Sequence, residues 1–456
     1  MKTYLKKLLL IFPLLVSCED FLDLSPPKNQ LVGEHVFEEA ATVDGVFAHI
    51  YTGLRESAFT AGTGSGISYA LGHYADELDH LSENQPVTRN FYNNSVLPGD
   101  SSVDGLWNSS YKLIYDCNSI LEGVENSSSL SQMEKDRFMG EAFFLRAFLH
   151  FYLVNLFGDI PYVDNTDYRA NLKLSGMERD AVYERILEDA RKARELLANQ
   201  GSLGNQFRPD QWTATTFLAR VYLYMENWES AREEAEYVIS EGPFLLEEEL
   251  ESVFLKDSQE TLWHLGAGAP GENTEEGNTF IAFNAPPRYT ALSNALLDSF
   301  EAGDGRYVHW VGSISDDSQT WYFPFKYRYN GLTDETMEYS ILFRLAEPYL
   351  ISAEAHAQLG ALVEGSYYVN KVRERADLPP LPMMERDDLL GAIYHERRIE
   401  FFSEQGHRFF DLKRTGRANG ILSMTKPYWD GTDILLPLPE NELLKNPNLL
   451  PQNEGY

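Results

Sequence analysis

Three carboxylates spaced four residues apart near the C-terminal end of the chain are the first candidates for chemistry. Glu396, Glu400 and Glu404 would share one face of a helix, and carboxylates that converge from one face can act as a general acid and a general base. Arginines interleave with them in the segment HERRIEFFSEQGHRFFDLKRTG, residues 395–416. Because a neighbouring guanidinium lowers a carboxyl pKa, the pattern favours a structural ion-pair network over an acid/base pair.

The same segment predicts two consecutive helices with large rings between their charges. The first carries Ile393 and Glu400 on one side and is expected to end at Gly406, in the position that a C-cap glycine favours. The second is expected over His407–Arg414. Four phenylalanines in this stretch are too many for a solvated surface, so the charges are expected to lie near buried apolar area and to need partners.

Other patterns that carry chemistry are weak or missing in this sequence. It contains no phosphate-binding loop, HExxH, CxxC or GxSxG motif. The glycine run at 62–66 lacks a following lysine and reads as a flexible loop, and His150, alone on an aromatic face, reads as a core residue. The acidic run Asp76, Glu77 and Asp79 lacks the spacing of a calcium loop and reads as a solvated turn. We therefore expect no metal and no cofactor.

Composition limits the partners of the chain. The 456 residues are 43% hydrophobic and 13% aromatic, which is typical of a globular protein, and the formal net charge is -32. Such a charge repels nucleic acid and anionic lipid at long range, so no nucleic-acid partner is expected. The chain has 26 tyrosines, 26 phenylalanines and 7 tryptophans, so some of these aromatic rings are available to stack on a flat, neutral ligand.

Apolar periodicity predicts a mostly α-helical chain with two irregular stretches. Helices are expected over 37–55, 107–124, 133–157, 179–197, 211–240, 343–359 and 367–376. The irregular stretches are 57–104 and 242–339, the second with a short strand at 261–265 and a short helix at 292–300.

A distant internal repeat indicates helical hairpins. Small and apolar residues between Ala219 and Val238 recur, at the same spacing, 134 residues later between Ala353 and Val372. This is the tetratricopeptide pattern, in which each helix pair buries its apolar face against its neighbours.

The N-terminus resembles the export signal of a lipoprotein. Lys2, Lys6 and Lys7 precede an apolar run, and Leu15-Val16-Ser17-Cys18 fits the box before a lipid-modified cysteine. This predicts a signal peptide at 1–17, acylated Cys18, and an extended tether over 18–36 that contains Pro26 and Pro27. The alternative is an ordinary secretory signal cut nearby. Cys117, the other cysteine, then has no internal disulfide partner.

Four segments in order, together with this box, carry a resemblance to a known family. They are FFLRAFLHFYLVNLFGDIPYV, FRLAEPYLISAEAHAQL with YYVNKVRERA, ERRIEFFSEQGHRFFDLKRTG, and ILLPLPENELLKNPNLLPQNEGY. They resemble the SusD/RagB family, cell-surface glycan-binding lipoproteins that work with a SusC-like TonB-dependent outer-membrane transporter.

The resemblance implies a fold, a cellular location and a function. The fold would be SusD-like and mostly α, with tetratricopeptide-type hairpins, a loop-rich ligand face, an N-terminal helical region at 37–241 and a C-terminal region at 242–456. The protein would be anchored to the outer membrane by lipid, facing the cell exterior, and would bind an oligosaccharide or polysaccharide without catalysis. A surface glycoside hydrolase remains one alternative. A lipoprotein that caps the transporter and binds peptide, or no glycan, is the other.

The family places its sugar-stacking rings in the loops before the helix at Trp107 and before FRLAEPYL. Trp321 is the leading candidate, because it follows the polar run 313–320, where a ring is expected at a loop edge. The sequence predicts a ligand platform with these members: Trp321, Tyr322, Trp310, Tyr289, Arg288, Phe91, Tyr92 and Asn93.

The lipobox yields a direct test. Cys18→Ala should leave the protein without acyl chains and move it from the membrane fraction to the soluble fraction, because only those chains oppose extraction from the bilayer. Labelled fatty acid incorporated by the growing cells measures the modification, with Cys117→Ala as the matched control that keeps its label. A Cys18→Ala protein that still takes up label would contradict the assignment.

Overall fold

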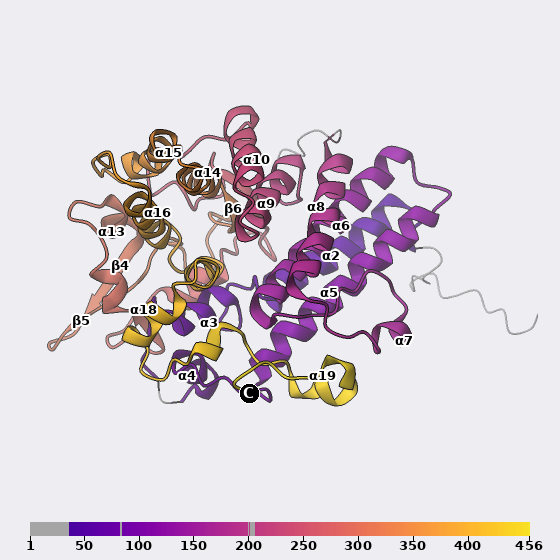
Figure 1. Cartoon of the computed structure of the whole chain (residues 1–456), viewed down its shortest axis with the longest axis horizontal. Coiled ribbons are helices and arrows are strands. Elements are labelled where there is room, and N and C mark those ends of the chain that lie inside the picture. The colour runs from indigo at the N-terminus through magenta and orange to yellow at the C-terminus, as the bar shows by residue number, and fades with distance from the viewer. Residues whose placement is uncertain (1–35, 83, 199, 201–205) are drawn as a thin grey trace, which may run out of the picture.

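The computed structural model describes residues 36–82, 84–198, 200 and 206–456, and Figure 1 shows their arrangement. The predicted signal peptide, Cys18 and nearly all of the 18–36 tether lie outside the described residues. The part that is described is mostly α-helical, as the sequence predicted. None of its helices combines the length and the apolar character needed to span a bilayer.

Long helices form one side of the molecule (Figure 1). They are α2 (Ala40–Glu56), α5 (Ser101–Asn126), α6 (Gln132–Phe157) and α8 (Arg179–Leu197), joined by the short α7 (Tyr168–Asn171). The helix α6 starts at a capping box between Ser131 and Glu134, and nearly every residue from Phe138 onward is buried. It packs between α5 and α8, and its buried Arg146 pairs with Asp189 of α8 at 2.7 Å.

Two helix pairs follow the predicted repeat. They are α9 (Gln211–Tyr224) with α10 (Trp228–Glu241), and α14 (Ala346–Gln358) with α15 (Leu362–Arg375). Both ends of α15 lie 134 residues after those of α10, the offset of the sequence repeat. The helix α10 packs on α14, so the two pairs are neighbours despite the long insertion between them. Their assignment to the tetratricopeptide type stays a prediction.

Short elements fill the loop-rich side. They are α3 (Ile67–Tyr74), β1 (Leu78–His80), α4 (Pro86–Tyr92), β2 (Thr261–Leu265), α11 (Glu275–Phe280), β3 (Thr290–Leu292), α12 (Asn294–Leu297), α13 (Gly305–Trp310), β4 (Val311–Ser315), β5 (Thr320–Pro324) and β6 (Ser340–Arg344). The strands form three antiparallel ladders, β1 with β3, β2 with β6, and β4 with β5. Because β3 also lies against β5, the β1–β3 ladder and the β4–β5 ladder are neighbours.

The prediction of an irregular chain over 57–104 was wrong for α3, β1 and α4. Every residue of α3 is buried, so the segment has no polar face and shows no helical period. Its start is fixed by Gly66, where a side chain would place its Cβ only 1.6 Å from the carbonyl oxygen of Ala61.

The C-terminal helices are α16 (Arg386–Glu400), α17 (His407–Arg414), α18 (Ala418–Thr425) and α19 (Glu440–Lys445). The bounds of α17 are those predicted, but the helix before it ends at Glu400 and not at Gly406. Ser403, Gln405 and Gly406 all have positive φ angles, so the chain turns tightly between the two helices. At Gly406 a Cβ would stand 2.5 Å from Leu71, which leaves no space for a side chain.

Buried ion pairs join the loop-rich side to the helices, and we call this group the charged seam. Glu400 accepts hydrogen bonds from Arg306 at 2.9 Å and from Arg344 and Arg375. The other members are Glu396, which accepts from Arg306 and Arg373, and Glu404, which accepts from Lys326 and Arg344. All three carboxylates are paired, which confirms the structural interpretation of this segment.

The acidic run at Asp76 is also part of the interior, so its prediction as a solvated turn was wrong. Asp76 and Glu77 are 4% and 1% exposed. The Asp76 carboxylate accepts two hydrogen bonds from Arg408, at 2.7 and 2.9 Å, and a third from Arg398. Burial alone would raise the pKa of Asp76, but the two guanidiniums outweigh it and lower the pKa below its ordinary value.

Removing the guanidinium of Arg408 should leave the Asp76 carboxylate buried without its main partner. We expect Arg408→Ala to lower the free energy of unfolding by about 3 to 5 kcal/mol, the typical cost of stranding one member of a buried pair. Urea denaturation at pH 7 measures it. Arg179→Ala is the matched control, because the Arg179–Asp180 pair is exposed and its loss should change stability by less than about 1 kcal/mol. Equal stabilities for the two variants would contradict the structural role of Arg408.

Candidate functional site

A groove made of three adjoining cavities runs along the loop-rich side. We name the cavities after residues in their linings: the Tyr289 cavity of about 720 Å³, the Glu276 cavity of about 490 Å³ and the Lys256 cavity of about 700 Å³. The first two share Glu275 and Asn278, and the second and third share Arg55 and Tyr339. Because the linings overlap, the cavities adjoin, and we refer to the three together as the loop groove.

Segments far apart in the sequence build the loop groove. The end of α2 meets the start of α11 and the loops at 62–66, 266–274 and 331–340 there. The glycine run, which the sequence assigned to a flexible loop, packs against α11. A Cβ at Gly62 would stand 2.2 Å from the Glu276 carboxylate, so only glycine permits this approach.

Hydroxyl and amide groups dominate the Tyr289 cavity. Two rings, Tyr69 and Tyr289, contribute to its wall, and Glu275 is the one charged residue of its described lining. The polar side chains are Ser57, Ser65, Asn84, Gln85, Thr88, Ser101, Ser102, Asn278 and Thr279. Each can donate and accept hydrogen bonds, so the cavity matches a neutral ligand that is rich in hydroxyl groups.

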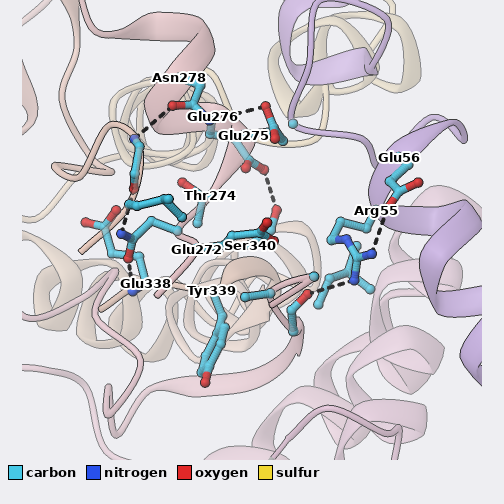
Figure 2. Close-up of a pocket in the computed structure, with 18 residues that line it drawn as sticks. Arg55, Glu56, Glu272, Thr274, Glu275, Glu276, Asn278, Glu338, Tyr339 and Ser340 are labelled. Carbon is cyan, nitrogen blue, oxygen red and sulfur yellow. Dashed lines mark hydrogen bonds and ion pairs between the residues drawn. The ribbon is translucent and has the colours of Figure 1, made fainter. Parts of the chain in front are cut away.

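The Glu276 cavity has more carboxyl groups in its lining than the Tyr289 cavity has, and Figure 2 shows them. The Glu276 carboxylate accepts a hydrogen bond from the Ser340 hydroxyl, while its Oε2 is buried with no partner among the described residues. Burial raises the pKa of Glu276 to about 7. Burial likewise raises the pKa of Glu338 to about 7, although the backbone N–H groups of Arg328 and Tyr329 donate to it.

Cations of the groove are held in ion pairs. Arg55 pairs with Glu56 at 2.7 Å, and both are labelled in Figure 2. Lys256 pairs with Glu335 at 3.1 Å. Arg208 pairs with Asp44 at 2.7 Å and with the buried Glu141.

Two predicted ligand rings belong to the core, so their assignment to the ligand surface is corrected. Trp310 is fully buried, and its indole N–H donates to the Leu250 carbonyl at 2.9 Å, while Lys326 lies over its ring at 4.8 Å. Phe91 is 2% exposed and packs on Tyr74. Neither ring can contact a ligand without rearrangement of the core.

Tyr92 and Asn93 are engaged within the protein. The Tyr92 ring lies 3.9 Å from the Lys426 ammonium, and its hydroxyl donates to Asp79 at 3.5 Å. Asn93 ends α4, where its backbone N–H donates to the Arg89 carbonyl.

Of the other predicted ligand residues, Tyr289 lines the groove, while Arg288, Trp321 and Tyr322 lie outside the lining of its three cavities. Tyr289 lines the Tyr289 cavity, and the Arg288 guanidinium lies over its ring at 4.8 Å. Trp321 and Tyr322 are half-buried on β5, which lies against β3, the strand that follows Tyr289. Their contact with a ligand stays a prediction.

The Glu276 cavity was not predicted from the sequence. Its side chains include Thr274, Glu276, Tyr339 and Ser340, which lie in the stretch assigned to loop and ribbon. The local abundance of glycine, asparagine and threonine was the available signal. It does not reveal that this stretch meets the end of α2.

The carboxylates first considered for catalysis lie elsewhere. Glu396, Glu400 and Glu404 line none of the three cavities. Within the described ranges, no group of three or more histidine, cysteine, aspartate and glutamate residues is placed to hold a metal ion.

Two models of known protein families together match most of the chain. A family model described as starch-binding and associating with the outer membrane matches residues 20–223, and a model described as the SusD family matches residues 309–456. The SusD-like protein P2 of Formosa agariphila is 28% identical over the full length of both chains. A SusD-like protein of Bacteroides ovatus is 24% identical over 98% of each.

Solved structures share the fold. A SusD superfamily protein from Bacteroides vulgatus superposes with a TM-score of 0.79 at 21% identity, covering 92% of this chain and 100% of that one. A laminarin-binding SusD-like protein superposes with a TM-score of 0.75 at 22% identity, covering 91% and 99%.

The raised pKa of Glu276 gives a pH test. The folded state prefers the protonated carboxyl, so its contribution to stability is largest near and below the ordinary pKa of 4.5 and is lost as pH rises through about 7. Glu276→Gln keeps the acceptor for Ser340 but cannot ionise. We expect it to gain about 1 to 3 kcal/mol of unfolding free energy relative to wild type between pH 5 and pH 8.

Urea denaturation at several pH values between 5 and 8 measures this gain. Glu229→Gln is the matched control, because Glu229 is exposed on α10 and its loss should leave the pH profile unchanged. Parallel pH profiles for wild type and Glu276→Gln would contradict the assignment.

Proposed function

Because the chain belongs to the SusD/RagB family, we propose that it binds an oligosaccharide or polysaccharide at the cell surface and delivers it to a SusC-like TonB-dependent transporter. In this proposal the chain holds the glycan and performs no covalent chemistry. The groove supplies the binding surface, and the transporter supplies passage across the outer membrane.

The observation that carries the proposal is the chemistry of the Tyr289 cavity. Sugar rings present C–H faces that pack on aromatic planes and hydroxyl groups that need donors and acceptors around them. The cavity combines the half-buried ring of Tyr289 with a wall of hydroxyl and amide side chains, whereas Tyr69 in the same wall is 4% exposed and packs on His73 and Phe280. The laminarin-binding neighbour in structure supports the choice of a glycan.

The length of the groove supports a chain of sugars as the ligand. A ligand confined to the Tyr289 cavity would leave two adjoining cavities of comparable size unused. Units of an oligosaccharide could continue past Asn278 into the Glu276 cavity. In this proposal Arg288, Trp321 and Tyr322 extend the platform beyond Tyr289, which is supported by the contact of the Arg288 guanidinium with the Tyr289 ring and by the position of β5 against β3.

Anchoring at the outer membrane rests on the sequence. We propose that Cys18 carries the lipid and that the segment up to residue 36 tethers the folded part to the membrane, with the groove on the exterior side. Glu19, Asp20 and Asp23 follow Cys18 and resemble the signal that directs family lipoproteins to the surface.

A surface glycoside hydrolase is the second candidate, and one observation favours it. Glu276 and Glu338 line the groove with raised pKa values, the property that a general acid needs. Incubating the mature chain with a polysaccharide panel, and measuring both retention on native gels and new reducing ends, separates the two functions. Retention without reducing ends supports binding alone.

Trp321 is the ring whose truncation tests the platform. We expect Trp321→Ala to weaken binding of the retained glycan by about 2 kcal/mol or more, because a stacking ring is typically a binding hot spot. The free energy of unfolding should change by less than about 1 kcal/mol, since the ring is half-buried on a hairpin.

Titration calorimetry measures the change in binding free energy, and urea denaturation of the same samples measures the change in the free energy of unfolding. Tyr367→Ala, which removes an exposed ring on α15, is the matched control and should bind normally. Normal glycan binding by Trp321→Ala would move the platform to Tyr289 and the Tyr289 cavity.

A further inference from the structure

We infer that the loop groove takes neutral glycans and rejects glycans that carry carboxylate or sulfate groups. This inference rests on the proposed function and adds the chemical class of the ligand. Three features of the lining carry it: the absence of a cation from the described Tyr289 cavity, the pairing of the cations farther along, and an excess of carboxyl groups.

The first feature is the neutral wall of the Tyr289 cavity. In the part of this wall that the structure describes, serine, threonine, asparagine and glutamine supply the polar atoms, and neither lysine nor arginine contributes. Proteins recognise carboxylate and sulfate with arginine, lysine or clustered backbone N–H groups. An anionic sugar entering here would lose its hydration and meet Glu275 instead of a cation.

The second feature is that each cation of the described groove already has a carboxylate. Arg55 and Lys256 are paired with Glu56 and Glu335. Arg208 holds Glu141, which is 2% exposed, so turning Arg208 toward a ligand would strand a buried acid. An anionic ligand would therefore compete with existing ion pairs.

The third feature is the excess of carboxyl groups at the centre of the groove. One cation, Arg55, lines the described part of the Glu276 cavity, against these acids: Glu56, Glu272, Glu275, Glu276 and Glu338. Burial keeps Glu276 and Glu338 partly protonated near pH 7, so the group carries less than five negative charges. Low-dielectric walls focus the field of the charge that remains into the cavity, so a polyanion is repelled as it enters. The net charge of the chain, -32, acts in the same direction.

Arg288 is a cation at the rim that an anionic glycan could reach. It is exposed and lies over the Tyr289 ring, outside the lining of the three cavities. One guanidinium at the edge does not compensate the carboxyl groups inside, so we expect the N–H groups of Arg288 to donate hydrogen bonds to the hydroxyl oxygens of a neutral sugar.

The experiment compares glycans by charge on the full mature chain. Native affinity gels test laminarin, starch and galactan as neutral probes, and alginate, polygalacturonate and carrageenan as anionic probes. We expect at least one neutral glycan to retard the protein and no anionic glycan to do so. Sulfating the retained glycan should weaken its binding about tenfold or more at low salt, and added salt should reduce that difference by screening.

Charge variants locate the effect in the groove. The triple variant Glu56→Gln, Glu272→Gln and Glu275→Gln should narrow the ratio of the neutral-glycan affinity to the sulfated-glycan affinity several-fold, because it removes carboxylates from the groove. The matched control changes net charge equally at three exposed acids on α10 and α15, namely Glu229→Gln, Glu241→Gln and Glu364→Gln. It should leave both affinities near those of wild type.

The outcomes are distinguishable. Tighter binding of an anionic glycan than of its neutral counterpart overturns the inference and leaves the proposed function intact. An equal gain in affinity for the sulfated glycan in both triple variants overturns the assignment to the groove. Binding of an anionic glycan that is lost in Arg288→Gln also overturns the inference, because it would show that the rim recognises anions. Retention of no glycan of either class overturns the proposed function itself.

Discussion

The carboxylate of Glu400 is the point on which the two sides of the molecule depend. It is fully buried, yet it accepts hydrogen bonds from arginines on α13, β6 and α15, and these charges hold its pKa well below the ordinary value despite burial. Removing any one partner would leave unbalanced charge in the interior. Arg344 ends β6, and Ser340, at the other end of the same strand, lines the groove. The seam therefore fixes one wall of the site.

Local pattern determined how much of this fold could be predicted. The bounds of α8, α17 and β2 agree with the sequence, because each element has a clear apolar period or a short apolar run between breakers. The helix α3 was missed because it is buried on all sides. The end of α16 was misplaced because the turn that follows it is set by packing of Gly406 against Leu71, a residue more than three hundred positions earlier.

Long-range contacts also explain the mixed result for the site. Trp310 and Trp321 stand in the same aromatic stretch, and sequence offers no local reason to separate them. Burial of Trp310 follows from Leu250 and Lys326, which approach it from other segments. Trp321 lies on the β4–β5 hairpin and stays half-exposed. The Glu276 cavity was still harder to foresee, since it exists only where the end of α2 meets loops two hundred residues away.

The seam and the charge of the groove have one cause in common. The interior uses arginines in quantity, because each buried carboxylate of the seam and of the Asp76 turn requires a guanidinium. The chain has 38 basic residues against 70 acidic ones, and each buried pair withdraws one of each, so the whole excess of acid stays on the surface while the share of bases among the surface charges falls. A groove formed on that surface inherits carboxyl groups whose charge is not offset by free cations. The rejection of anionic ligands that we infer would then follow from how the fold is held together, because such a surface offers a ligand hydroxyl groups and rings but few free cations.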